Sequence, residues 1–116
     1  MNDLIELRNV LREFAKERDW DQFHSPKNLS MALAGEMGEL IEKFQWMSEE
    51  ASCHLSDDLR YEIAEEIADV LIYLIRLADK CEIDLVEATE QKLQKNRLKY
   101  PAKKVRGKSK KYSDYK

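Results

Sequence analysis

The chain has 116 residues, enough for one domain, and its many Leu, Glu, Lys and Ala with only three glycines and two prolines favour helix over sheet. Its longest apolar run, Val70 to Ile75, is far shorter than the roughly 20 residues of a membrane span, and no basic and apolar leader opens the chain, so we expect a cytoplasmic protein without a membrane partner. Residues 1–101 hold 13 basic and 22 acidic side chains, whereas residues 102–116 hold seven basic side chains and one acidic side chain. We therefore expect an all-α domain over residues 1–101, followed by a basic, flexible tail over residues 102–116.

The first helix is predicted over residues 3–18, with Asp3 placed to cap its first turn. Its apolar residues recur at helical spacing and are Leu4, Leu7, Leu11 and Phe14. The charged residues of this helix are typical of a solvated face.

The loop between Arg18 and Pro26 is unusually rich in rings and has neither a helical nor an alternating period. Its central residues are Trp20, Asp21, Gln22, Phe23 and His24. The rings can plug the end of a helix bundle, with His24 as a hydrogen-bonded bystander. Alternatively they form a platform on which a base stacks, an interaction worth about 1 to 3 kcal/mol per base. The loop by itself leaves both interpretations open.

The second helix is predicted to begin at Ser25 and Pro26, because serine is a good N-cap and proline suits the first helical position. Gly35 and Gly38 lie inside this helix, where each costs about 1 kcal/mol relative to alanine. We therefore expect another backbone or a ligand to lie close to them.

The exit of the second helix carries Trp46, followed by a polar connection over residues 48–55. Trp46 either caps the core or forms the second wall of a base pocket.

The third helix is predicted from Ser56 to about Lys80, and it repeats the pattern of the second. The second helix carries Leu29, Leu33, Glu36, Met37, Glu39, Leu40, Ile41 and Phe44. Thirty positions later, the third carries Leu59, Ile63, Glu66, Ile67, Asp69, Val70, Leu71 and Leu74. At about 100° per residue, the apolar residues of each helix share one face that has an acidic pair at its flank.

If these two helices pack through their apolar faces, Glu36, Glu39, Glu66 and Asp69 converge on one spot. Unit charges about 4 Å apart repel by roughly 1 to 4 kcal/mol, so such a cluster needs a compensating cation. Hard oxygen ligands in this number suit Mg²⁺, which also takes phosphate oxygens from a substrate. The alternative is that both acidic pairs lie on solvated helix faces. This interpretation is less favoured because the same pattern of acids and apolar residues occurs on both helices. Tyr73 lies one turn beyond Asp69, so its hydroxyl either reaches this site or is the wet tip of a packing residue.

A fourth helix is predicted over residues 84–100, ended by Pro101. Lys92, Asn96 and Tyr100 recur on it every four residues and form one polar face. This face suits a phosphate chain, although a solvated helix face is the commoner cause of such spacing.

Four segments in this order resemble the MazG-like all-α nucleotide pyrophosphohydrolases. They are Gly35-Glu36-x-Gly38-Glu39-Leu40, Phe44-Gln45-Trp46, Glu66-x-x-Asp69-Val70-Leu71-Ile72-Tyr73-Leu74 and Lys95-Asn96-Arg97-x-Lys99-Tyr100-Pro101. Within that superfamily the dCTP pyrophosphatases are the most similar group, because of the loop Arg18-Asp19-Trp20-x-Gln22-Phe23-His24-x-Pro26. The resemblance covers nearly the whole chain.

The resemblance implies a four-helix-bundle-like fold whose helices pack across the subunits of a homo-oligomer, a dimer or a tetramer. It implies a house-cleaning enzyme that hydrolyses a nucleoside triphosphate, dCTP or a modified dCTP, to the monophosphate and pyrophosphate with Mg²⁺. The implied catalytic residues and metal ligands are Glu36, Glu39, Glu66 and Asp69. The acceptor of the water proton stays open, with Glu42, Glu62 and Glu65 as further candidates.

The substrate contacts are also implied by the resemblance. Trp20 and Trp46 correspond to rings that enclose the base. The other implied contacts are Asp21, Gln22, Phe23 and His24 at the base end, Tyr73 near the sugar, and Lys92, Asn96 and Tyr100 beside the phosphates or the base edge. One position departs from the pattern, because vertebrate dCTP pyrophosphatases carry a histidine near the nucleotide where this chain has Leu11.

Other functions fit the sequence less well. A di-iron bundle needs Glu-x-x-His on two helices, whereas positions 39 and 69 hold Glu and Asp. A noncatalytic helical module that binds through the basic tail leaves the acidic cluster unexplained, so nucleic acid is not the expected partner. Within the family, the alternatives are a dUTP or broad-specificity dNTP pyrophosphatase and the phosphoribosyl-ATP hydrolase, and the tryptophan loop favours a pyrimidine base.

Overall fold

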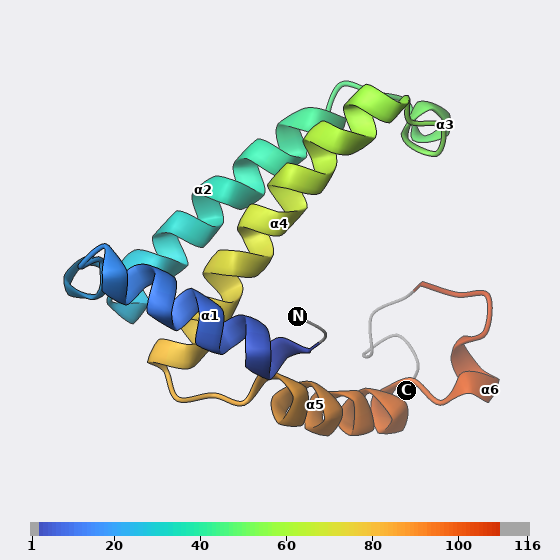
Figure 1. Cartoon of the computed structure of the whole chain (residues 1–116). Helices are drawn as coiled ribbons and strands as arrows, with labels where there is room; N and C mark the ends of the chain where they lie inside the picture. The colour runs from blue at the N-terminus through green and yellow to red at the C-terminus, as the bar shows by residue number, and fades with distance from the viewer. Residues whose placement is uncertain (1–2, 110–116) are drawn as a thin grey trace. The chain divides into compact units, whose positions relative to one another are not determined.

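The computed structural model describes residues 3–109, and every regular element in this range is helical, which confirms the predicted all-α class (Figure 1). The chain divides into two units, Met1–Ile83 and Asp84–Lys116, which are treated separately because their relative positions are not determined. The first unit contains α1 (Leu4–Glu17), the 3-10 turn η1 (Asp21–Phe23), α2 (Pro26–Phe44), α3 (Glu49–Ser52) and α4 (Asp57–Lys80). The second contains α5 (Leu85–Lys99) and α6 (Ala102–Val105).

The long helices begin at the predicted caps. The side chains of Asp3, Ser25, Ser56 and Asp84 accept a hydrogen bond from the backbone N–H three residues further on, at 2.7, 3.2, 3.2 and 3.0 Å. Caps of this kind contribute about 1 kcal/mol each. Local sequence signals therefore account for where α1, α2, α4 and α5 start.

The core of the first unit lies where α4 packs against α2 and against α1. Figure 1 shows α2 and α4 side by side over most of their length. Leu29 and Ile63, which occupy the apolar faces of the repeat, are buried, and Ile75 of α4 and Ala15 of α1 extend the core. The predicted packing of the two repeat helices is thus confirmed.

Several apolar residues of the repeat are exposed in the described part of the first unit. Ile41 and Ile67 are 51% and 52% exposed, and Met37, Leu71 and Leu74 are also exposed. Exposed apolar residues that form a contiguous patch mark a surface where another part of the chain or another molecule can bind.

Within the predicted polar connection after α2, residues 49–52 form the short helix α3. Ser48 caps this helix by accepting from the Ala51 N–H at 3.1 Å, and Glu49 and Glu50 stand in its first turn. A cap and two acids at a helix N-terminus favour helix even over one turn.

The predicted basic tail begins with α6, and residues 110–116 lie outside the described part of the chain. Its flexibility stays a prediction. Between residues 3 and 109, no helix combines the length and the apolar character needed to cross a bilayer.

Gly35 and Gly38 face open space in the described structure, since a Cβ placed on either would have no atom within 4 Å. The close neighbour expected for these glycines is therefore not found in this part of the chain. The reason for these glycines stays a prediction.

We expect Gly35→Ala to raise the free energy of unfolding of the isolated chain by about 0.5 to 1 kcal/mol, because alanine loses less backbone entropy in a helix. Urea denaturation at low protein concentration measures it. Ala34→Gly, next to it on α2, is the matched control and should lower stability by a similar amount. A loss of stability in Gly35→Ala would show that another molecule already contacts this position.

Candidate active site

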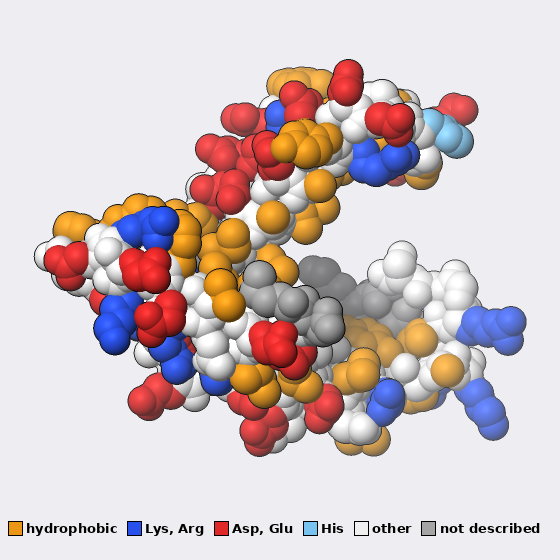
Figure 2. Space-filling view, in the orientation of Figure 1, with side chains coloured by type: hydrophobic (Ala, Val, Ile, Leu, Met, Phe, Trp, Pro, Cys, Tyr) orange, Lys and Arg blue, Asp and Glu red, His pale blue; other side chains and the backbone are white. Residues whose placement is uncertain are grey.

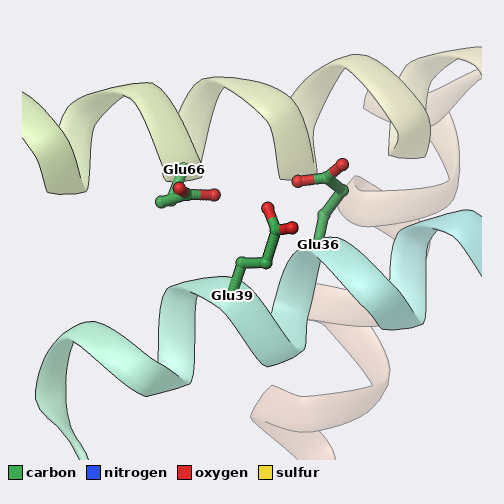
Figure 3. A group of neighbouring side chains, drawn as sticks. All are labelled: Glu36, Glu39 and Glu66. Atoms are coloured by element: carbon green, nitrogen blue, oxygen red, sulfur yellow. The ribbon is translucent and has the colours of Figure 1, made fainter.

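Three of the predicted acids meet between α2 and α4. Glu36 and Glu39 extend from α2 toward Glu66 on α4, as Figure 3 shows. Each offers one carboxylate oxygen, and the three oxygens lie within 4.8 Å of one another. Residues three apart on a helix lie on neighbouring parts of its surface, so both α2 acids face the same partner.

The fourth predicted acid, Asp69, lies one turn after Glu66 on α4. Its charge helps to raise the pKa of both Glu36 and Glu66, so it is within electrostatic range of the cluster. Its side chain also lines a neighbouring pocket. Asp69 therefore connects the carboxylate cluster to that pocket.

The cluster is short of positive charge. Burial, followed by the neighbouring Glu39 carboxylate, raises the pKa of Glu36 to about 7, and the same two causes raise the pKa of Glu66. Glu36 Oε2 and Glu66 Oε2 are buried and have no hydrogen-bond partner among the described residues. Burying such atoms without a partner is costly. A hard divalent cation such as Mg²⁺ fits these oxygens, because it supplies the missing charge and takes oxygen ligands.

A pocket of about 260 Å³ lies beside Asp69. Its walls come from α1, the aromatic loop and α4, and they are Leu11, Phe14, Ala15, Trp20, His24, Asp69, Ile72, Tyr73 and Arg76. Pockets that bury a whole drug-sized ligand measure roughly 300 to 1,000 Å³. This pocket is therefore of a size for one part of a larger molecule, such as the base of a nucleotide.

Trp20 is placed by the way in which α1 ends. The backbone N–H of Trp20 donates to the Ala15 carbonyl at 2.9 Å, and the backbone N–H of Asp19 donates to the Lys16 carbonyl at 3.0 Å. Asp19 has a φ of 55°, the left-handed conformation of a Schellman motif. The Trp20 ring then packs edge-on against Phe14, with centroids 5.7 Å apart.

His24 is held in one tautomer by Arg76. Burial, then the charge of Arg76, lowers the pKa of His24, so its ring is neutral at pH 7. His24 Nδ1 lies 3.4 Å from Arg76 Nε and 3.3 Å from Nη2. Arginine only donates, so Nδ1 accepts and the ring proton sits on Nε2.

The other predicted residues of the loop do not line the pocket. Asp21 accepts from Arg76 Nη2 at 2.8 Å, and the Gln22 amide donates to the carboxylate and the carbonyl of Asp19 at 3.0 Å. Phe23 is 60% exposed. Contact of these three residues with a substrate stays a prediction.

Trp46 lies at the opposite end of α2 from Trp20 and is 89% exposed. The two ends of this 19-residue helix are about 28 Å apart at a rise of 1.5 Å per residue. Within one chain, the two tryptophans therefore do not enclose the same base.

Lys92, Asn96 and Tyr100 belong to the second unit, on α5 and at its C-cap. Because the position of this unit relative to the first is not determined, their part in the site stays a prediction.

Arg76 and the α1 residues Phe14 and Ala15 line the pocket but were not among the predicted site residues. A signal for Arg76 was available, because it interrupts an apolar stretch between Ile75 and Leu77. An arginine in such a place is buried and needs an anionic partner from elsewhere in the chain.

Comparisons with known proteins agree with the resemblance seen in the sequence. The profile of the MazG-like family matches residues 32–115. The proteins named dCTP pyrophosphatase 1 from Mus musculus and from Homo sapiens are each 47% identical over 113 residues, which cover 96% of this chain and 66% of those proteins. This chain therefore spans just under two thirds of their length.

A solved structure is similar as well. The crystal structure of a pyrophosphatase from Archaeoglobus fulgidus is 45% identical and superposes with a TM-score of 0.78, over 83% of this chain and 90% of that one. With a profile that matches most of its length and relatives this similar, the chain belongs to the MazG-like family.

Proposed function

We propose that the chain is a Mg²⁺-dependent nucleoside triphosphate pyrophosphohydrolase that converts dCTP, or a modified dCTP, and water to dCMP and pyrophosphate. The proposal rests on Asp69, which lines the aromatic pocket and also belongs to the carboxylate cluster. The names of the relatives, two dCTP pyrophosphatases and a pyrophosphatase, support the same reaction.

The order of side chains along α4 supports one orientation of the nucleotide. Arg76 and Tyr73 lie at the pocket, Asp69 lies at the junction and Glu66 lies in the cluster. These residues span about 15 Å of helix. A base stacked beside Trp20 thus places the sugar near Tyr73 and the phosphates near the carboxylates.

The carboxylates of Glu36, Glu39, Glu66 and Asp69 would hold the cation. Bound Mg²⁺ would neutralise these carboxylates and the phosphates, and would stabilise the charge that develops in the transition state. The water oxygen forms a bond to the α-phosphorus while the bond from this phosphorus to the α–β bridging oxygen breaks. Pyrophosphate leaves, and a carboxylate of the site takes the proton of the water.

A second copy of the chain would complete the base pocket. Trp46 is exposed and too far from Trp20 to share a base with it in one chain. Figure 2 shows hydrophobic side chains at the surface along the α2 and α4 pair, and Ile41 and Ile67 are among the exposed ones. A homo-oligomer, dimer or tetramer, that covers this surface would bring Trp46 of one copy to the pocket of another.

A broad-specificity dNTP or dUTP pyrophosphatase is the second candidate, and Leu11 favours it. Leu11 lines the pocket, and its apolar side chain has no group that can hydrogen-bond to a base edge. Discrimination between bases would then depend on His24 and on residues from outside the first unit.

We expect Glu39→Gln and Asp69→Asn to lower kcat by at least about a hundredfold, because each removes a charge that would hold the cation. Chromatography of the products from the four dNTPs, dUTP and 5-methyl-dCTP, with Mg²⁺ or EDTA, measures both rate and selectivity. Glu49→Gln, on the exposed helix α3, is the matched control and should leave kcat unchanged. Full kcat in the two acid variants at saturating Mg²⁺ would contradict the metal site.

Stability without Mg²⁺ should fall as pH rises from about 5 to 7. The pKa of Glu36 is raised to about 7 in the folded state, so in this window the folded chain binds more protons than the unfolded chain, and each step up in pH favours unfolding. Thermal melts in EDTA should show this slope, and Glu36→Gln should flatten it. Millimolar Mg²⁺ should raise the Tm most at pH 7, because only the folded chain presents the site. A Tm indifferent to Mg²⁺ at every pH would count against a preformed site.

The shared pocket can be tested by mixing two defective proteins. Trp20→Ala and Trp46→Ala should each raise KM strongly, but hybrids of the two variants contain one pocket with both indoles. Random assortment at equal amounts should restore about a quarter of the normal sites. Two affinity tags confirm that subunits have exchanged, and each variant exchanged with itself is the control. If the hybrids recover no activity, the shared pocket is contradicted. Both tryptophans then act in the site of the same chain, or they do not share a site at all.

A further inference from the structure

Arg76 is a buried charge at the pocket. Its side chain lies on α4, and the residue is 3% exposed, the only charged residue classed as buried between residues 3 and 109. Nη2 donates to Asp21 Oδ1 at 2.8 Å, and Nη1 lies 3.5 Å from Asp79 Oδ2. Together with the contacts to His24, these partners use all sides of the guanidinium. A buried arginine is tolerated when its planar fork is satisfied in this way.

The partners of Arg76 are themselves held by other cations. Arg12 of α1 binds Asp79 through two hydrogen bonds, at 2.6 and 3.0 Å, and Lys80 Nζ lies 3.1 Å from Asp21 Oδ1. Arg12 is the main cause of the lowered pKa of Asp79, and Lys80 is the main cause of the lowered pKa of Asp21. Alternating charges thus join α1, the aromatic loop and α4.

This network lies away from the carboxylate cluster. Arg76 follows Glu66 by ten residues, about 15 Å along α4, so the guanidinium is not the counter-ion of the cluster. Its donors are turned to Asp21, His24 and Asp79, and it meets the pocket only as part of the wall. Because these donors are already engaged, we expect Arg76 to act on a bound base mainly through the loop that it contacts.

We propose that Arg76 is a positioning residue for base recognition, which holds Asp21 and His24 so that the loop presents the Trp20 ring and the His24 imidazole to the pocket. The proposal rests on the proposed nucleotide pyrophosphohydrolase function. It gives Asp21 a role as an anchor of the loop, and it makes selectivity for the base depend on the ion pair between Arg76 and Asp21.

Two substitutions test this role from opposite sides. Arg76→Lys keeps the charge but loses the planar fork, and Asp21→Asn removes the anionic partner at a position that is 43% exposed. Arg60→Lys is the matched control, because Arg60 lies on the same helix, is 65% exposed and pairs with Asp57. Asp21→Asn alone decides the test if Arg76→Lys does not fold.

The first readout needs no nucleotide. In proteins that also carry Trp46→Phe, Trp20 is the remaining tryptophan. Its fluorescence therefore reports how accessible the loop is to solvent. We expect both variants to increase the acrylamide quenching of Trp20 by about twofold, because a released loop opens locally. The Arg60→Lys control should leave the quenching unchanged.

The second readout is steady-state hydrolysis in proteins that retain Trp46. KM for dCTP should rise about tenfold in each variant, which corresponds to about 1.4 kcal/mol of binding, while kcat stays within about twofold. The double variant should be no worse than either single one, because both break the same link. The rise in Tm with Mg²⁺ should be unchanged.

Unchanged quenching together with unchanged KM would overturn the proposal, and so would a fall in kcat with KM unchanged. Additive effects in the double variant would also overturn it, because they would mean two separate contacts. If none of the proteins hydrolyses any nucleotide, the proposed function fails, and the quenching measurement still decides whether Arg76 holds the loop.

Discussion

Repulsion among the carboxylates between α2 and α4 opposes the apolar packing that holds these two helices together. The apolar packing of Leu29 and Ile63 brings Glu36, Glu39 and Glu66 together. The helices therefore store unfavourable electrostatic energy, which the burial of apolar surface offsets. A triphosphate would bring further negative charge to the same place, so binding of the proposed substrate and of a cation at this site would be coupled.

The charges around Arg76, further along α4, are arranged differently from those around Glu36. Around Arg76 each charge has a partner of opposite sign, and the lowered pKa values of Asp21 and Asp79 reflect this. Around Glu36 the neighbours carry the same sign, and its pKa is raised. The residues of α4 thus contribute to a network of paired charges around Arg76 and, together with α2, to a cluster of like charges around Glu36. Perturbed acids of the second kind are the ones that point to function.

The helices and the acidic cluster were predictable because their signals are local or periodic. Caps such as Ser25 and Ser56 mark helix starts, and a repeat in equal phase forces Glu36 and Glu66 to face each other. The pairing of Arg12 with Asp79 was not predictable, since these residues are 67 positions apart and neither has a special local pattern. The fold of the loop was also hidden, because its turn uses Asp19 in a left-handed conformation where glycine would have been the usual signal.

The distance between the two tryptophans follows from the sequence once α2 is accepted as one continuous helix. A 19-residue helix keeps Trp20 and Trp46 apart, so a pocket walled by both requires two copies of the chain. The six apolar side chains that are buried in the described residues make a small core for a domain of this length, and α2 and α4 also carry exposed apolar residues. Association through those faces would complete the core and the pocket in one event, so fold stability and base recognition would respond together to protein concentration.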